Sequence, residues 1–249
     1  MKPIVFKTIE DAYIIQTAKH HRVALDDEFL TGFGSGFLNI YYKAWIDSPY
    51  SYNIVAIESE SEEDLNSDPS QIIVAGAMLV ALDPSNHYRY IFRHHIWSLT
   101  FAATKASLSK PTFLFKLLQT RGIYYLQGIS KMTLRSIKSS LKSIIMKMSS
   151  NPKSDSPADM VDDSNKHEPL RIAELTHIFT DKEYRRLGIA TTMIKMLKDQ
   201  CESQNISRIE LVTPAESDAV RFYEKLGFSN LGTLVAKTKE SFIKFQLDI

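Results

Sequence analysis

Hydrophobic and polar positions follow a regular pattern in the last third of the chain. Apolar residues recur there at every second position, as in a half-buried strand, or at three- and four-residue spacing, as in a helix with one buried face. Thr213-Pro214 is expected to end one strand and Gly227 to cap one helix. The predicted elements are a strand at 172–180, a helix at 187–201, a strand at 206–212, a helix at 216–226, and an antiparallel pair at 229–235 and 241–248. This order predicts an α/β or α+β sheet with crossover connections.

The N-terminal part of the chain predicts a second group of elements. They are a strand at 4–8, a helix at 11–22, a Gly-rich turn at 31–36, a helix at 37–45, and strands at 52–58 and 71–82. Gly76 lies inside the last of these strands, where a glycine marks a bulge or a close approach of backbones. The acidic residues between 58 and 68 predict a solvated hairpin loop.

The middle of the chain, at about 84–170, has a less regular pattern. Helix-like stretches lie around 91–106 and 111–126, and both are rich in aromatic and basic residues. The stretch 131–150 is basic, and 151–165 has the Asp, Ser, Pro and Asn content of a linker. We therefore predict a single domain over 1–249 with an insertion at 84–170, of which 131–170 is partly linker-like.

Composition and charge exclude several classes of protein. The net charge of +1 gives no general attraction to nucleic acid. Cys201 is the only cysteine, so no internal disulfide can form, and a reducing compartment is expected. The N-terminal residues do not form a secretory signal, and no apolar run is long enough to cross a membrane. We expect a cytoplasmic protein.

Chemistry is suggested first by the loop Arg185-Arg186-Leu187-Gly188-Ile189-Ala190, which follows one predicted strand and opens a helix. The N-terminus of a helix presents free N–H groups and the positive end of the helix dipole, so it can bind phosphate. Gly188 lets the backbone approach phosphate oxygens, and Arg185 and Arg186 add positive charge. The loop lacks the Gly-Lys-Ser/Thr of a P-loop.

This loop resembles the pyrophosphate-binding pattern Gln/Arg-x-x-Gly-x-Gly/Ala of the GNAT superfamily of acetyl-CoA-dependent N-acetyltransferases. A second hallmark, a helix ending in Tyr-Glu-Lys-Leu-Gly-Phe, is matched at 223–228. The resemblance covers 172–248 and extends more weakly to 1–82. It implies a GNAT fold of the α/β (α+β) class. In that fold a mixed, splayed central sheet is flanked by helices, here with a helical insertion between the first hairpin and the central strand.

The same resemblance implies acetyl-CoA as co-substrate and assigns its binding residues. The strand before the loop would bind the pantetheine arm through its backbone, and the loop would bind the pyrophosphate. Many members have Asn where this chain has Glu216, so Ser217 is expected to supply that polar contact. The cofactor-binding residues implied are Ile178, Phe179, Thr180, Arg185, Arg186, Leu187, Gly188, Ile189, Ala190, Thr191, Ser217 and Tyr223.

Two catalytic residues are implied in the same way. Glu174 would be the general base that deprotonates the amine, and Tyr223 the general acid that returns a proton to the departing thiolate. Alternation along the strand would place His177 on the face opposite Glu174. No metal site is assigned, because the pairs His20-His21 and His94-His95 cannot converge on one ion. Candidates to line the acceptor pocket are Tyr88, Tyr90, Arg93, His94 and Trp97.

The function implied is transfer of an acetyl group from acetyl-CoA to a primary amine by direct attack. A small acceptor such as an amino sugar is favoured by the long insertion. Two alternatives stay open: a protein N-acetyltransferase acting on a lysine or an N-terminal amine, and a catalytically silent module that binds acyl-CoA. A nucleic-acid partner is not expected. The acyl chain length and the oligomeric state, for which a homodimer is one alternative, are not determined by the sequence.

Overall fold

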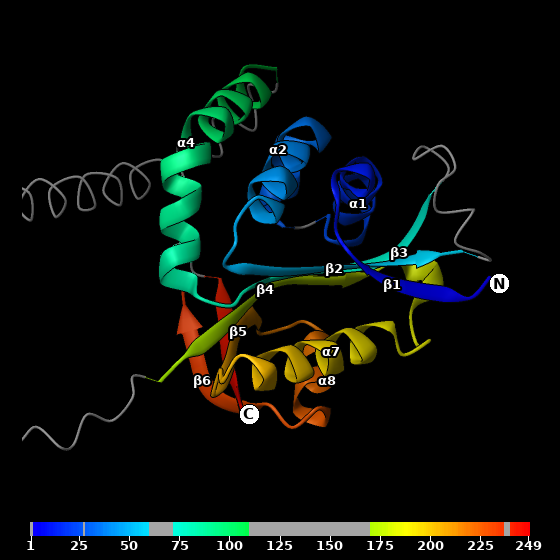
Figure 1. Ribbon diagram of the computed structural model, residues 1–249, viewed down its shortest axis with the longest axis vertical. Helices are drawn as coiled ribbons and strands as arrows, with labels where there is room; N and C mark the ends of the chain where they lie inside the picture. Colours follow the sequence, from blue (N-terminus) through cyan, green and yellow to red (C-terminus); the bar gives the residue numbers. More distant parts are fainter. Residues whose placement is uncertain (1, 27, 60–71, 110–169, 237–239) are drawn as a thin grey trace, which may run out of the picture. The chain divides into compact units, whose positions relative to one another are not determined.

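The central feature of the computed structural model is a seven-stranded mixed sheet with helices on both faces (Figure 1). The structure describes residues 2–26, 28–59, 72–109, 170–236 and 240–249, which belong to one compact unit. The strand order in the sheet is β1-β2-β3-β4-β5-β7-β6. The strands are β1 (Ile4–Thr8), β2 (Ser51–Glu58), β3 (Ile73–Ala81), β4 (Ile172–Thr180), β5 (Arg208–Pro214), β6 (Ser229–Val235) and β7 (Ser241–Asp248).

The helices form one layer on each face of the sheet (Figure 1). One layer contains α1 (Asp11–Ala24), α2 (Ser35–Ile46) and α4 (Pro84–Ser109), and the other contains α7 (Ile189–Ser203) and α8 (Ala219–Lys225). Short 3-10 helices lie at η1 (Phe29–Phe33) and η4 (Lys182–Tyr184). Within the described ranges, no helix is both long and apolar enough to cross a bilayer.

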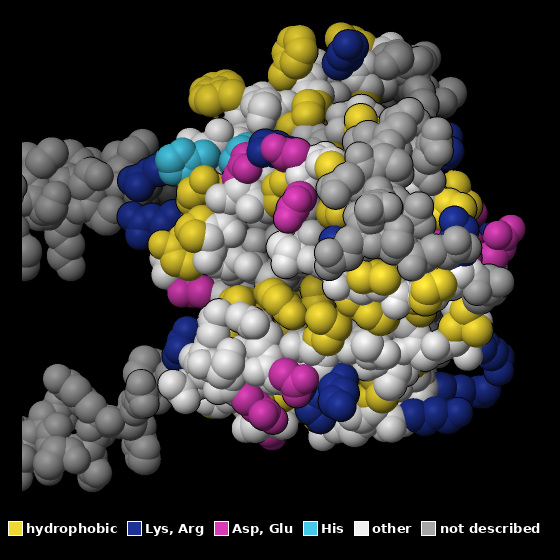
Figure 2. Space-filling model, turned by 45° about the vertical axis from the view of Figure 1, so that its right-hand side comes forward, with side chains coloured by type: hydrophobic (Ala, Val, Ile, Leu, Met, Phe, Trp, Pro, Cys, Tyr) yellow, Lys and Arg dark blue, Asp and Glu magenta, His cyan; other side chains and the backbone are white. Residues whose placement is uncertain are grey.

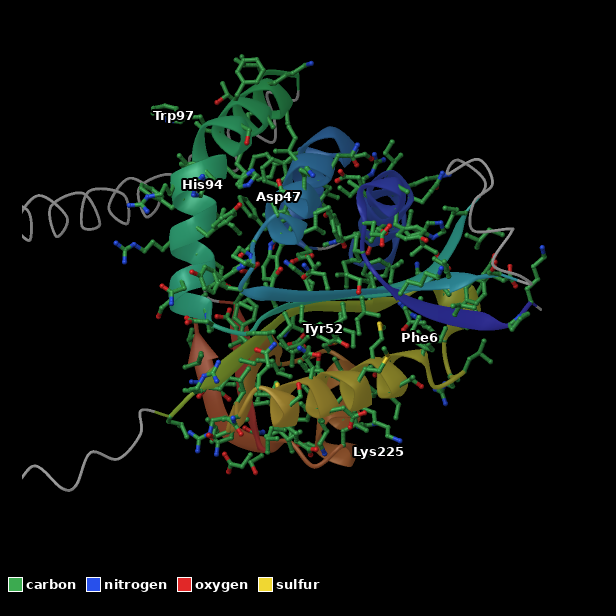
Figure 3. The ribbon with its side chains drawn as sticks, viewed as in Figure 1. Phe6, Asp47, Tyr52, His94, Trp97 and Lys225 are labelled. Carbon is green, nitrogen blue, oxygen red and sulfur yellow. The ribbon has the colours of Figure 1, made fainter. Side chains whose placement is uncertain are left out.

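The main hydrophobic core lies between the sheet and α7. Buried residues of α7, namely Met193, Ile194 and Leu197, pack against Met78 of β3 and Phe245 of β7. Phe6 and Tyr52 fill the same space from β1 and β2 (Figure 3). Burying the one apolar face of α7 in this way stabilises the helix and fixes its N-terminus against the end of β4.

Two differences from the sequence prediction are instructive. β5 continues through Thr213 to Pro214, which lies opposite Phe242 of β7. Thr213 and Pro214 are therefore the last two residues of the strand, which ends two residues later than predicted. Pro214 is tolerated there because β4 has already diverged, so no neighbouring strand needs the N–H that proline lacks. α4 is one helix that begins at Pro84, earlier than the predicted 91–106 stretch. The predicted 58–68 loop beyond residue 59, the 111–126 helix, and the 131–170 segment up to residue 169 lie outside the described residues.

Gly76 is a point of close backbone approach, as the sequence predicted. A Cβ on this residue would lie 2.6 Å from the carbonyl oxygen of Phe179 on β4. The neighbouring residue Ala75 is unpaired at a bulge between β2 and β3. Any larger residue at position 76 would therefore push β4 away from β3 at the end where the phosphate-binding loop begins.

Replacing Gly76 by Ala is expected to lower the free energy of unfolding by about 1–3 kcal/mol, because the obstructing atom is backbone and cannot rotate away. Urea denaturation would measure the change. Gly36→Ala is the matched control, since no atom lies within 4 Å of its added methyl group. That variant is expected to be neutral or more stable by up to about 1 kcal/mol, because Ala favours helix. Equal stability of Gly76→Ala and wild type would contradict the close approach.

Candidate active site

The loop between β4 and α7 has left-handed backbone conformation at two positions. Arg186 has φ of +64° and Gly188 has φ of +79°, both in the left-handed region. Tyr184 and Ile189 are buried on either side of the loop, and the Tyr184 hydroxyl donates to Glu58 Oε2 at 3.1 Å. A non-glycine residue such as Arg186 is uncommon at positive φ, and such strain is concentrated at functional sites.

The same loop presents a group of unpaired N–H donors at the start of α7. The first backbone bond of the helix runs from Thr192 N–H to Gly188 C=O at 2.9 Å. The N–H groups of residues 188–191 therefore have no acceptor within the helix. A Cβ on Gly188 would meet no atom within 4 Å, so the backbone is open to solvent at that position. The donors and the positive end of the helix dipole suit the binding of an anion, and we call this region the anion site.

Basic residues outnumber acidic ones in the loop beside this anion site, because Lys182, Arg185 and Arg186 accompany Asp181 and Glu183. Lys182, Arg185 and Arg186 are all exposed in the loop. The space-filling view shows Lys and Arg side chains gathered at the lower right edge of the face that it draws (Figure 2). An anion with more than one negative charge, such as a pyrophosphate, fits the number of donors and the charge better than a single carboxylate does.

A gap between β4 and β5 opens along β4 in the direction of the anion site. The two strands pair in parallel only over Ile172–Glu174 and Arg208–Glu210. Beyond Glu174, β4 pairs only with β3, and beyond Glu210, β5 pairs only with β7. The two strands therefore splay apart. Along the edge that faces the gap, the backbone N–H and C=O groups of each strand have no partner strand.

The hydrogen-bond pattern shows which residues of β4 face this gap. Asp181 N–H donates to Ala75 C=O at 2.8 Å, so this position directs its backbone groups toward β3. In an antiparallel pair, residues whose backbone groups bond to the partner strand alternate with residues whose backbone groups point away from it. Phe179 and His177 therefore also face β3, whereas Ile178 and Thr180 direct their N–H and C=O groups into the gap. Of the three strand residues expected to bind the pantetheine arm, Ile178 and Thr180 are placed for it and Phe179 is turned away.

Glu174 lies at the point where β4 and β5 separate. Its Oε1 accepts a hydrogen bond from the Tyr88 hydroxyl at 2.9 Å, and Tyr88 comes from the first turns of α4. Burial and the neighbouring Glu174 charge raise the pKa of Tyr88 well above its usual value, so this phenol remains a donor. Among the candidates for the acceptor pocket, Tyr88 thus reaches β4, whereas Trp97 points away from the sheet and is 83% exposed (Figure 3).

A bulge in β4 changes which side chains share a face. Leu79 lies opposite His177 but Val80 lies opposite Leu175, which leaves Thr176 as an extra residue. Strict alternation is broken there, so the expectation that His177 and Glu174 occupy opposite faces is wrong. Both lie on the face covered by α1, α2 and α4, while Leu175 and Ile178 pack toward α7.

His177 belongs to a buried polar cluster that the sequence did not reveal. Its Nδ1 lies 3.0 Å from Glu28 Oε1, and its Nε2 lies 2.8 Å from the Tyr41 hydroxyl. The other oxygen of Glu28 lies 2.7 Å from His21 Nε2, and His21 Nδ1 lies 2.9 Å from the Tyr42 hydroxyl. In the described part of the chain, His21, Glu28 and His177 form the group whose donor atoms are close enough to hold a metal ion.

The ionisation of Glu28 sets the direction of these hydrogen bonds. Burial raises the pKa of Glu28, but hydrogen bonds from His177 and His21 outweigh it and bring the pKa to about 2. The carboxylate can then only accept, so His21 Nε2 and His177 Nδ1 both donate to it. Burial lowers the pKa of His21, so this ring stays neutral and its Nδ1 accepts from the Tyr42 hydroxyl.

Tyr223, the expected general acid, is 5% exposed and packs on Phe222, Phe228 and Phe245. Burial raises the pKa of its phenol well above the usual value, so it carries its proton at neutral pH. Ser217 Oγ accepts a hydrogen bond from the Ala219 N–H at 3.2 Å, just before α8 begins, and α8 is shorter than the predicted helix. The Ser217 hydroxyl proton remains available to another acceptor.

The sequence singled out some of these residues and not others. The loop at 185–190, strand β4 and Glu174 were singled out from the motifs, and their roles stay predictions. Glu28 and Tyr41 were not considered, and His21 was considered only as part of a rejected metal pair. His21 occupies a buried position on α1 at the spacing of that helix's other buried residues, Thr17 and Ala18. This spacing is the only sequence signal that it faces the protein interior, and nothing in the sequence links it to Glu28.

Comparison with known proteins gives a family match for the C-terminal part of the chain. Residues 160–249 match the family model described as an acetyltransferase (GNAT) domain. None of the curated proteins compared with the chain matches it in sequence.

Solved structures give remote similarities over most of the chain. Ard1 from Thermoplasma volcanium is 11% identical with a TM-score of 0.49, and 99% of this chain and 97% of that chain are covered. The ribosomal-protein-S18-alanine N-acetyltransferase from Escherichia coli is 12% identical with a TM-score of 0.46, covering 99% and 94%. The spermidine/spermine N-acetyltransferase SpeG from Vibrio cholerae is 12% identical with a TM-score of 0.48, covering 99% and 95%.

The mixed, splayed sheet with helices on both faces confirms the α/β fold class expected from the sequence. The C-terminal part of the chain, residues 160–249, matches the acetyltransferase (GNAT) domain family.

Proposed function

We propose that this protein transfers the acetyl group of acetyl-CoA to a primary amine of a small molecule. The observation that carries the proposal is the row of free N–H groups at residues 188–191, directly beside the unpaired edge of β4. The pyrophosphate would bind to that row with help from Arg185 and Arg186. The pantetheine arm would lie in the gap and bond to the backbone of Ile178 and Thr180.

The amine would attack the thioester carbonyl directly. An ammonium with a pKa near 10.4 costs about 4.6 kcal/mol to deprotonate at pH 7, so a base near the reacting nitrogen is needed. Glu174 is our candidate, because it lies where the gap begins and accepts a bond from Tyr88. A backbone N–H of Ile178 or Thr180 would stabilise the oxyanion, and Tyr223 would protonate the departing thiolate.

A small acceptor is favoured over a protein by the position of α4. This helix begins at Pro84 and brings Tyr88 over Glu174, so the first turns of the insertion cover the carboxylate. A peptide would need an open groove along that face. An amino sugar or a similar amine fits the covered site, and we retain a lysine or an N-terminal amine as the alternative acceptor.

Calorimetric titration of the purified protein tests the cofactor, with CoA and ATP as comparison ligands. We expect saturable micromolar binding of acetyl-CoA and CoA, and none of ATP, because the gap accommodates an arm that ATP lacks. Release of CoA thiol in the presence of small amines and of peptides then separates the two acceptor classes. A folded protein that binds neither CoA species would refute the proposal, and turnover with peptides alone would refute the small acceptor.

A further inference from the structure

The two adjacent histidines of α1, His20 and His21, have different partners. His21 is buried and bonds to Glu28, whereas His20 Nδ1 lies 2.7 Å from Asp181 Oδ2. A carboxylate offers only acceptors, so His20 Nδ1 carries the proton of this bond. His20 therefore joins the first helix to the residue that directly follows β4, 161 positions later in the chain.

Asp181 connects the end of β4 to the loop that carries the anion site. Its N–H donates to Ala75 C=O of β3 at 2.8 Å, and its C=O accepts the Tyr184 N–H at 2.9 Å. Its Oδ1 accepts the Glu183 N–H at 3.2 Å and so caps η4. With His20 on Oδ2, both backbone groups and both carboxylate oxygens of Asp181 are bonded, so the course of the loop is set at this residue.

Both ends of the loop rest on the same two residues of β3. Asp181 is bonded to Ala75, and a Cβ on Gly76 would lie 3.4 Å from Ile189 Cγ2, so the first residue of α7 packs close to Gly76. Figure 1 shows α1 over the end of the sheet at which β4 passes into α7. Because the loop between these two ends is short, the direction in which Asp181 is held affects where the N–H groups of residues 188–191 stand.

The bond to His20 also has an electrostatic consequence. Asp181 is one of two acidic residues in a loop that presents donors to an anion. A carboxylate that turned toward the anion site would repel a phosphate. The side chain of Asp181 is 16% exposed, and its Oδ2 is bonded to His20 on α1. The bond thus keeps this negative charge directed at the first helix.

We propose that His20 is a positioning residue for the cofactor. Through Asp181 it fixes the loop in the form that binds the pyrophosphate of acetyl-CoA. Because His20 acts through Asp181, it affects the binding of acetyl-CoA and leaves the chemical step unchanged. This inference rests on the proposed function, since it assigns a residue to the same cofactor site.

The test measures acetyl-CoA affinity and steady-state rates for His20→Leu, which keeps a side chain of similar size and removes both ring nitrogens. We expect Kd and KM for acetyl-CoA to rise about 10-fold, the order of one hydrogen bond to a charged group. The values of kcat and of KM for the amine should match wild type. A variant that merely folds poorly would instead show a lower apparent kcat with KM unchanged, because only the active fraction falls.

His95→Leu is the matched control. His95 Nε2 lies 3.6 Å from Asp47 Oδ2, so this variant removes a second histidine–aspartate contact, between α4 and α2. It should bind acetyl-CoA as wild type does. His20→Asn is the conservative variant, because its side-chain amide keeps an N–H donor near the position of Nδ1. This variant should retain part of the affinity that His20→Leu loses.

Asp181→Ala tests the route of the effect. This variant removes the carboxylate and its bond to Glu183, so it should weaken acetyl-CoA binding at least as much as His20→Leu does. In the Asp181→Ala background, His20→Leu should have no further effect on Kd, because the residue through which it acts is gone.

Wild-type acetyl-CoA affinity in His20→Leu would overturn the proposal. So would an equal loss in His95→Leu, a His20→Asn variant no better than His20→Leu, additive effects of the substitutions at 20 and 181, or a fall in kcat with KM unchanged. Failure of the proposed function is distinguishable, since wild type would then bind no acetyl-CoA and release no CoA thiol with any amine.

Discussion

Gly188→Glu is expected to weaken acetyl-CoA binding by at least about 100-fold while the protein stays folded. The new carboxylate would stand in the open space before the N–H groups of residues 188–191 and repel the pyrophosphate. Loss of two charge-assisted hydrogen bonds at about 1.5–3 kcal/mol each is enough for this change. The positive φ of +79° also disfavours any side chain, so a small loss of stability should accompany it.

Calorimetry with acetyl-CoA measures the loss, and circular dichroism checks the fold. Gly36→Glu is the matched control, because position 36 also has no atom within 4 Å of an added Cβ but lies on α2. It should bind acetyl-CoA as wild type does. Undiminished affinity in a folded Gly188→Glu protein would show that the pyrophosphate binds elsewhere.

Tyr223→Phe is expected to lower kcat by about 10²-fold or more with little effect on acetyl-CoA affinity. The phenol ring, which packs on Phe228 and Phe245, would remain, so the core is preserved. What is removed is the hydroxyl, and general acid catalysis is typically worth 10²–10⁴-fold. Because the pKa of this phenol is raised by burial, it stays protonated at neutral pH and is poised to donate.

Steady-state rates and calorimetry on the same preparation separate the two effects. Tyr13→Phe is a suitable control, since Tyr13 is a second buried tyrosine, 6% exposed, on α1. Its kcat should be unchanged. If Tyr223→Phe turned over at the wild-type rate, the hydroxyl would have no part in the reaction and Tyr223 would be a core residue only.

Local pattern was sufficient for most of the fold. β6 and β7 have the predicted bounds. α7 buries one face at the predicted spacing, because the periodicity of apolar residues encodes which side of a helix is buried. The loop at 185–190 was found for a similar reason: a strand, two arginines, a glycine and a helix start are contiguous, so their chemistry is visible without knowledge of distant residues.

Only the tertiary structure shows which residues share the face of the sheet that α1, α2 and α4 cover. The bulge at Thr176 places His177 on the same face as Glu174. The sequence of β4 does not predict this bulge, because a bulge depends on how β3 pairs with β4. The cluster of His21, Glu28 and His177 joins residues up to 156 positions apart, and only the packing of α1 against β4 brings them together. The sequence by itself therefore determined the loop and the strand that we propose for cofactor binding, because their residues are contiguous in the chain. The cluster of His21, Glu28 and His177 was decided by the tertiary structure, because long-range packing brings its residues together.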